Sequence, residues 1–147
     1  MEPRLGWAKT DIEAHRALQG VETYIRQTGL DGILIELVKV RASQLNGCAY
    51  CIDSHVKAAR KLGETDQRLH LLNAWREAPF YTDRERAALA WAEAVKLVSE
   101  DQIPDEVYAL AREHFDEKEL IALTVTVASI NTYNRMHTAF RTVPRSE

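Results

Sequence analysis

Apolar residues recur along the chain mainly at intervals of three and four, which is the period of an amphipathic helix. In residues 12–28 the apolar positions Ala14, Leu18, Val21 and Ile25 follow this spacing, and Gly29 provides a stop. Stop and start signals at glycines, prolines and capping residues divide the rest of the chain in the same way. About six or seven helices are predicted. They cover residues 12–28, 32–45 and 48–62, a short stretch after Thr65, residues 82–98, a stretch from Pro104, and residues 117–141.

The segment 120–130 is apolar or small on all sides and rich in β-branched residues. Alone it would suit a strand. It lies inside a longer segment that starts with the acidic sequence 116–119, and no partner strand is evident, so we predict a helix. A helix that is apolar all round is a buried one. In a domain of this size a neighbouring subunit would help to cover it, which favours an oligomer.

The length fits one domain spanning residues 1–147, and its predicted elements are all helices. Apolar residues make up 46% and charged residues 28% of the chain, and the net charge is −3. These values are ordinary for a globular protein with a real core. Basic residues are interspersed with acidic ones, so no nucleic-acid footprint is expected. No apolar run approaches 18 residues, and residues 1–10 lack the apolar segment of a signal peptide, so we expect no membrane span and a cytoplasmic location.

Both cysteines lie in one short stretch, Cys48-Ala49-Tyr50-Cys51, and His55 follows four residues later. Spacings of three, four and seven fall on one face of a helix. Asn46-Gly47 is a helix-stop signal, so the cysteines should open a new helix. Free N–H groups and the helix dipole stabilise a thiolate there, and the thiolate is the reactive form of cysteine.

Three other interpretations of the cysteine pair remain open. The two residues can simply pack in the core, form a static disulfide, or contribute to a zinc site. A structural zinc ion needs four ligands, and there is no second cysteine pair. A static disulfide is typical of secreted proteins. A redox-active pair is therefore favoured, with no metal and no cofactor.

Glu36 interrupts the apolar run 33–38 of the second predicted helix. A charge in such a run either lies on a solvent-facing stripe or is buried for a reason. The simple alternative is an ion pair with Lys39 one turn later.

With Glu36 and the cysteine–histidine stretch located, the sequence resembles the alkyl hydroperoxidase D-like (AhpD-like) core of the carboxymuconolactone decarboxylase superfamily. The motif of that family is a helix glutamate, CxxC twelve residues later and a histidine four residues after the second cysteine. Here it reads Glu36, Cys48, Cys51 and His55. Residues 44–48 are also similar to members of the family, and residues 76–79, 82–87 and 130–135 resemble one small single-domain branch of it. The resemblance therefore covers nearly the whole chain.

The resemblance implies an AhpD-like helical bundle, a homo-oligomer such as a trimer or hexamer, and thiol-dependent reduction of hydroperoxides. The counterpart of Cys51 attacks the peroxide in better-known members, and the counterpart of Cys48 resolves the sulfenic acid. Helix electrostatics alone leave this order open. His55 is expected to take the thiol proton, and Glu36 to orient His55 and carry the proton onward. A thioredoxin-like or other dithiol reductant would complete the cycle.

Some members carry a second histidine between the two cysteines, where this chain has Tyr50. A proton route through such a histidine is missing here or passes through water. Two other functions remain as alternatives: a lactone decarboxylase of the same superfamily, whose chemistry does not need two thiols, and a non-catalytic dithiol- or zinc-containing oligomer that binds partners.

The other four histidines lie on different predicted helices with no shared spacing, and the tryptophans are scattered. We therefore expect His15, His70, His114 and His137 to be surface or polar core residues rather than ligands. Trp7 is expected to be a packing residue.

Overall fold

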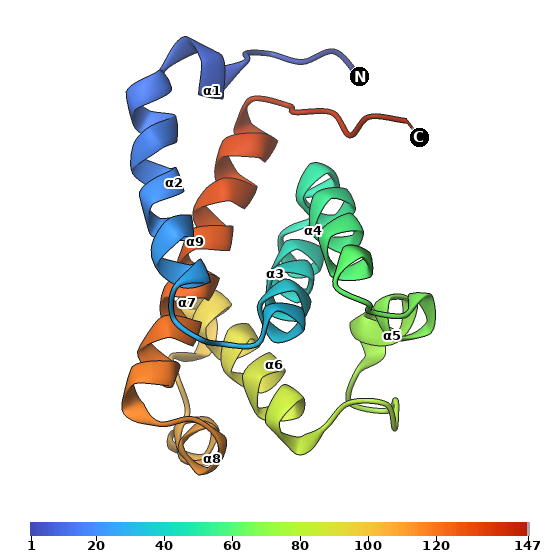
Figure 1. Ribbon diagram of the computed structural model, residues 1–147, viewed down its shortest axis with the longest axis vertical. Helices are drawn as coiled ribbons and strands as arrows, with labels where there is room; N and C mark the ends of the chain where they lie inside the picture. Colours follow the sequence, from blue (N-terminus) through green and yellow to red (C-terminus); the bar gives the residue numbers. More distant parts are fainter. Residues whose placement is uncertain (147) are drawn as a thin grey trace.

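The computed structural model describes residues 1–146, in which the regular elements are all helices (Figure 1). The predicted all-α class is confirmed. There are nine α-helices in this part of the chain rather than six or seven, because the one-turn helices α1 and α7 are too short to show a period. The elements are α1 (Trp7–Thr10), α2 (Ile12–Arg26), α3 (Gly32–Asn46), α4 (Ala49–Lys61), α5 (Asp66–Leu71), the 3₁₀ turn η1 (Leu72–Ala74), α6 (Asp83–Lys96), α7 (Val98–Asp101), α8 (Asp105–His114) and α9 (Glu117–Ala139).

The helix starts follow the capping signals of the sequence. Thr82 and Asp116 each accept a hydrogen bond from the backbone N–H three residues on, and the glutamate at that position bonds back, so both form capping boxes. Asp31 caps α3 with its side chain alone, which accepts a hydrogen bond from the backbone N–H of Leu34. At the other end of α3, Gly47 has a φ of 66°, a left-handed conformation that glycine adopts without strain.

The predicted helix over residues 117–141 is confirmed as α9, which ends at Ala139. It buries Leu123, Val127 and Ile130, whereas Ile121 remains 61% exposed. The alternative of a strand over residues 120–130 is wrong. The capping box at Asp116 and the packing of α9 on α2, α3 and α6 favour the helix over local β-propensity.

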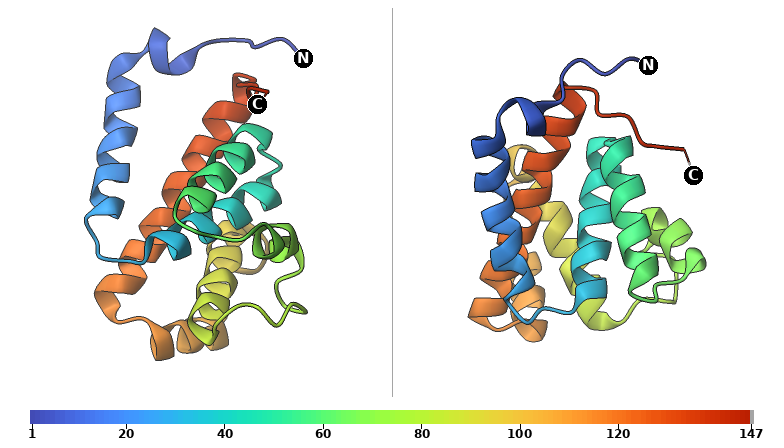
Figure 2. Two further views of the ribbon diagram at one scale, coloured as in Figure 1. Left: turned by 45° about the vertical axis from the view of Figure 1, so that its right-hand side comes forward. Right: turned by 45° about the horizontal axis from the view of Figure 1, so that its top comes forward.

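Helix α3 lies at the centre of the bundle and packs against α4, α6 and α9 (Figures 1 and 2). Its residues Leu37, Val38, Val40 and Ala42 are completely buried. Helices α3 and α4 form an antiparallel hairpin, so the start of α4 lies beside the end of α3. The central hairpin therefore fixes the position of the cysteines.

The N-terminal segment and the residues just after α9 meet above the start of α4 (Figure 1). The backbone N–H of Arg4 donates to the carbonyl of Phe140 at 3.0 Å, and that of Leu5 donates to the same oxygen at 3.4 Å. Because of this contact, segments from both termini border the region over the cysteines.

Two smaller features complete the fold. The predicted helix over residues 48–62 corresponds to α4, which ends at Lys61, and Leu62 after it is 53% exposed. Within residues 1–146, no helix combines the length and the apolar character that crossing a bilayer requires.

Candidate active site

The two cysteines lie at the N-terminus of α4, as the sequence predicts. Cys48 is the N-cap residue, and the backbone N–H of Cys51 donates to its Sγ at 3.4 Å. The two residues form a disulfide, with their Cα atoms 5.4 Å apart. Both are 2% exposed and pack with Ala42 and Ile130. The pair is thus held in a small buried cluster, at a helix end that favours negative charge.

Glu36 and His55 meet across the α3–α4 hairpin. Oε2 of Glu36 lies 2.7 Å from Nδ1 of His55, and the two side chains are 15% and 21% exposed. The simple alternative for Glu36, an ion pair with Lys39, is wrong. An ionised carboxylate only accepts hydrogen bonds, so Nδ1 donates to it and Nε2 is the ring nitrogen left for other chemistry.

A cavity of about 300 Å³ lies beside this assembly. Cys51 and His55 are both among its lining residues, whereas Cys48 and Glu36 are not. Cys51 is therefore the sulfur that borders the space, and Glu36 lies behind His55. The full lining is Trp7, Ala8, His15, Glu22, Tyr50, Cys51, Ser54, His55, Tyr133 and His137.

Glu22 of α2 is the carboxylate among the lining residues of the cavity, and the sequence pattern gave no sign of its place there. This residue of α2 pairs with Lys39 of α3, and its Oε1 accepts a hydrogen bond from Oγ of Ser129 at 2.6 Å. Lys39 is only 4% exposed. Burial alone would raise the pKa of Glu22, but Lys39, Ser129 and the nearby His55 together lower it below the usual range. An ionised carboxylate paired with a buried lysine therefore lies in the cavity wall.

Two more imidazoles reach the same cavity, from α2 and α9. His137 packs against Tyr50 with ring centroids 4.3 Å apart, and its Nδ1 lies 2.9 Å from Oγ1 of Thr142. Burial, together with His55 and His15, lowers the pKa of His137 to about 4. His15 and His137 thus border the site, although sequence spacing gave no sign of it. Of the four histidines treated as unrelated, His70 and His114 lie elsewhere.

An amide network anchors the loop before the cysteines to α9. Nδ2 of Asn46 donates to Oδ1 of Asn131 at 2.7 Å and to Oδ1 of Asn134 at 2.8 Å. Nδ2 of Asn134 in turn donates to Oγ of Ser43 at 2.9 Å. Asn134 and Ser43 are buried, so these bonds are shielded from water. The network holds the end of α3, and with it Cys48, in a fixed position.

The zinc interpretation finds no ligand set in the part of the chain described. Among residues 1–146, no group of three His, Cys, Asp or Glu side chains is placed so that it could hold a metal ion. The cysteine sulfurs bond to each other, and Nδ1 of His55 bonds to Glu36.

The sequence profile of the carboxymuconolactone decarboxylase family matches residues 13–94. This segment contains Glu36, both cysteines and His55. The chain belongs to the carboxymuconolactone decarboxylase family.

Relatives of similar length support this membership. The protein YdfG of Bacillus subtilis is 40% identical over 139 residues, which are 95% of each chain. A protein of unknown function from Agrobacterium tumefaciens, named as a candidate antioxidant defence protein AhpD, has a solved structure that superposes with a TM-score of 0.97. It is 40% identical, and the match covers 99% of this chain and 100% of that one. The resemblance to AhpD-like proteins is confirmed.

A more distant structure shows how widely the family fold extends. A peroxidase-related protein from Ralstonia eutropha with an AhpD core has a TM-score of 0.84 at 21% identity, over 95% of this chain and 74% of its own. At this identity the comparison shows the fold alone. The predicted AhpD-like fold is confirmed, with nine helices in residues 1–146.

Proposed function

We propose that this protein is a thiol-dependent peroxidase that reduces organic hydroperoxides through Cys48 and Cys51. The observation that carries the proposal is the placement of Cys51 and His55 in the wall of one cavity, with Cys48 bonded to Cys51 and Glu36 bonded to His55. A nucleophile, its resolving partner and an oriented imidazole are thus together. The name of the relative from Agrobacterium, a candidate antioxidant defence protein, agrees with this chemistry.

The cycle begins with the reduced pair. The Cys51 thiolate attacks the terminal oxygen of the hydroperoxide, so an S–O bond forms and the O–O bond breaks. The sulfur is oxidised to a sulfenic acid, and the departing alkoxide takes a proton from His55 to give an alcohol. Cys51 acts first in this scheme because its side chain borders the cavity and that of Cys48 does not.

The second step forms the disulfide. Cys48 as thiolate attacks the sulfur of the Cys51 sulfenic acid, so an S–S bond forms and the S–O bond breaks. The leaving hydroxide takes up the proton that the Cys48 thiol released and becomes water. An external dithiol, free or on a thioredoxin-like protein, then reduces the disulfide by exchange and is itself oxidised to a disulfide. The arrangement in the structure corresponds to the state before this reduction.

Thiolate formation by itself explains little of the rate. Lowering a thiol pKa from about 8.5 to about 6.5 raises the thiolate fraction at pH 7 roughly 25-fold. Nucleophilicity falls with a Brønsted slope of about 0.4–0.5, which removes roughly eightfold. The remaining threefold is small beside the ~10²–10⁴-fold that a positioned acid or base supplies. The proposed rate therefore depends on His55 and Glu36.

We also propose that the working form is a homo-oligomer, a trimer or hexamer. The exposed apolar side chains of Ile121, Val98 and Tyr108 are the surfaces that support it. Light scattering behind a sizing column measures the subunit number directly, and a monomer at micromolar concentration would contradict this part of the proposal.

The decisive experiment is a thiol titration. Reduced protein receives one equivalent of cumene hydroperoxide, and the remaining thiols and the cumyl alcohol are both counted. Two thiols lost for each alcohol formed support the cycle, and the Cys51→Ser variant should form no alcohol. If wild type and Cys51→Ser consume the peroxide equally, the proposal is wrong. Turnover of a muconolactone-type substrate without loss of thiols would favour the decarboxylase alternative instead.

A further inference from the structure

The proposed cycle uses Cys51 and His55 of the cavity wall but not Glu22. Helix α2, which carries Glu22, lies at one edge of the bundle, and α9 lies between it and α4 (Figure 1, and Figure 2, right). Glu22 lines the cavity from α2, whereas Cys51 and His55 line it from α4. The carboxylate and the reacting groups therefore border the same space from two different helices.

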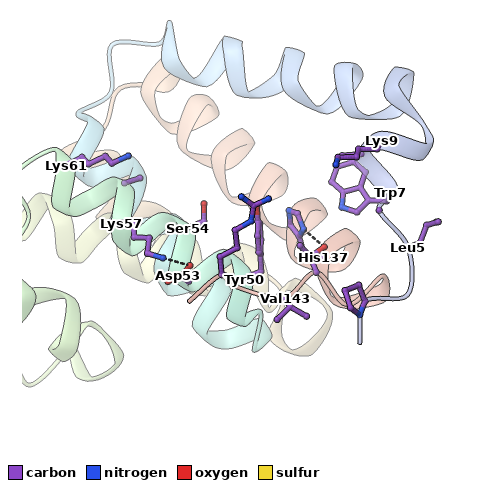
Figure 3. A pocket seen from close by; sticks show the side chains of 16 residues that line it. Leu5, Trp7, Lys9, Tyr50, Asp53, Ser54, Lys57, Lys61, His137 and Val143 are labelled. Atoms are coloured by element: carbon purple, nitrogen blue, oxygen red, sulfur yellow. Dashed lines mark hydrogen bonds and ion pairs between the residues drawn. The ribbon is translucent and has the colours of Figure 1, made fainter. Parts of the chain in front are cut away.

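A wider groove adjoins this cavity on the outside. It is lined by the N-terminal segment, one side of α4 and the C-terminal tail, and it shares Tyr50 and His137 with the cavity (Figure 3). Glu22, Cys51 and His55 line the inner cavity but not the groove. A ligand that enters through the groove therefore meets Glu22 only at the depth of the reacting groups.

Two contacts hold the carboxylate of Glu22 in place. Its Oε1 accepts a hydrogen bond from Oγ of Ser129 at 2.6 Å, and its Oε2 pairs with Nζ of Lys39. An ionised carboxylate has about four lone-pair positions, so these two contacts leave further acceptor capacity on both oxygens. The side chain also remains 17% exposed, although both oxygens are anchored. Glu22 thus offers a fixed acceptor with free capacity.

The pair of Glu22 and Lys39 presents its negative end to the cavity. Burial raises the pKa of Glu22, but Lys39, Ser129 and His55 outweigh it and lower the pKa, so the carboxylate is ionised and only accepts. Lys39 is 4% exposed and is not a lining residue of the cavity. Replacing a buried ion pair by apolar residues is often neutral or stabilising, so stability alone is a weak reason for this pair.

We infer that Glu22 contacts the substrate and accepts a hydrogen bond from the O–H of the hydroperoxide, while Nε2 of His55 donates to the other peroxide oxygen. This inference rests on the proposed function and adds a substrate-binding residue to it. A hydroperoxide group, R–O–O–H, carries its one donor on the terminal oxygen. An acceptor at Glu22 and a donor at His55 therefore orient the O–O bond and distinguish the oxygen that Cys51 attacks from the oxygen that leaves.

The hydrogen bond to Glu22 persists through the first chemical step. The Cys51 thiolate attacks the terminal oxygen, the S–O bond forms, the O–O bond breaks, and the leaving oxygen takes the proton from Nε2 of His55. The terminal oxygen keeps its hydrogen, so the S–O–H group of the Cys51 sulfenic acid still donates to Glu22. The carboxylate itself takes up no proton, in agreement with its lowered pKa.

A double change removes the acceptor without leaving a buried charge. Glu22→Gln/Lys39→Met keeps an oxygen that can accept but removes both charges, and Glu22→Met/Lys39→Met also removes the acceptor. In a single turnover with cumene hydroperoxide, the first variant should react about tenfold and the second about a hundredfold more slowly than wild type, the usual range for one hydrogen bond to a charged group. Unfolding midpoints in urea check the fold of each.

A second oxidant separates contact with the substrate from an effect on the thiolate. The compound 4,4′-dithiodipyridine reacts with the same Cys51 thiolate but has no O–H group. It should oxidise wild type and both double variants at equal rates, because removing Glu22 and Lys39 together leaves the net charge near the sulfur unchanged. Equal slowing with both oxidants overturns the inference, as does an unchanged rate with cumene hydroperoxide.

A milder variant keeps the ion pair intact. Ser129→Ala removes the hydrogen bond to Oε1 of Glu22 and should slow oxidation by cumene hydroperoxide about two- to tenfold, the usual net effect of one hydrogen bond. Thr132→Ala is the matched control on the same helix. Its hydroxyl donates to the carbonyl of Ala128 at 3.1 Å, and it does not line the cavity, so this variant should react like wild type. Equal slowing in the two variants contradicts the inference.

A binding measurement distinguishes this inference from the proposed function. Cumyl alcohol and cumyl methyl ether share a body and differ in the O–H group, and calorimetry gives their affinities for the oxidised protein. The ratio of alcohol to ether affinity should fall at least threefold from wild type to Glu22→Met/Lys39→Met, because only the alcohol donates to Glu22. Such a fall without oxidation of wild type by cumene hydroperoxide supports the acceptor site and contradicts the peroxidase. Oxidation of wild type with an unchanged ratio supports the peroxidase and overturns the inference.

Discussion

Replacing Glu36 by glutamine tests the proton path most directly. In the native protein, Oε2 of Glu36 lies 2.7 Å from Nδ1 of His55. Glutamine keeps the size of this side chain and an oxygen that can accept a hydrogen bond from Nδ1. What is lost is the negative charge that stabilises the imidazolium form of His55. If His55 protonates the departing alkoxide, the variant should oxidise more slowly although its fold is unchanged.

The size of the effect follows from the contact. A charged hydrogen bond is stronger than a neutral one by about 1 kcal/mol, which sets the lower limit. Two unit charges near a protein surface attract by about 4 kcal/mol, which sets the upper limit. Both side chains keep some contact with solvent, at 15% and 21% exposure, so we expect the lower part of this interval. A loss of about 1.4–2.5 kcal/mol corresponds to oxidation slowed about ten- to seventyfold.

The assay is a single turnover of the reduced protein with cumene hydroperoxide, which does not depend on any reductant. Glu117→Gln is the matched control, because this side chain is 85% exposed at the start of α9 and lies outside the cavity. It should react like wild type. Unfolding midpoints in urea check that all three proteins are equally stable. If Glu36→Gln is as fast as wild type and equally stable, Glu36 has no part in the proton path.

Three other changes have definite expected outcomes. Cys51→Ser should abolish oxidation by hydroperoxides, whereas Cys48→Ser should react once and stop at a sulfenic acid on Cys51. Mass spectrometry with a sulfenic-acid-specific probe detects this product. A sulfenic acid on Cys48 in the Cys51→Ser variant would reverse the assigned order. Lys39→Met leaves the Glu22 carboxylate buried without its cation, so the free energy of unfolding in urea should fall by about 3–5 kcal/mol. Adding Glu22→Gln to this variant should restore most of the lost stability. If stability is not restored, the broken ion pair is not the cause of the loss. The pKa of His137 is lowered to about 4 in the folded protein, below its ordinary value of about 6.5 when unfolded. The unfolded chain therefore binds more protons than the folded protein between pH 6.5 and 4, so stability falls as the pH is lowered through this window. The His137→Gln variant should lose stability less steeply over the same range. Identical pH profiles of the two proteins would contradict the burial of this imidazole.

Local rules predicted most of the helices, because helix boundaries depend on neighbouring residues. The capping boxes at Thr82 and Asp116 and the left-handed Gly47 act within four residues of a helix end. Local rules were wrong where an element is short or where a helix ends. Helices α1 and α7 have four residues each, too few to show a period. Leu62 continues the apolar pattern of α4 but lies beyond its last residue, so it is exposed.

The sequence by itself determined which side chains meet at the candidate site. The spacing of Cys48, Cys51 and His55 on one helix, and of Glu36 on the helix before it, is enough to bring these groups together once α3 and α4 form a hairpin. A hairpin of adjacent helices joins residues that are close in the chain, and Glu36 and His55 are only 19 positions apart. Short-range periodicity carries that information.

Only the tertiary structure decided what surrounds this chemistry. Glu22 reaches Ser129 across 107 positions, and His137 reaches Tyr50 from the last helix. Such contacts depend on how α2 and α9 pack against the central hairpin, which buried volume and side-chain shape determine and which no local spacing encodes. The sequence therefore specified the residues of the candidate site, while the packing of distant helices specified the cavity beside them.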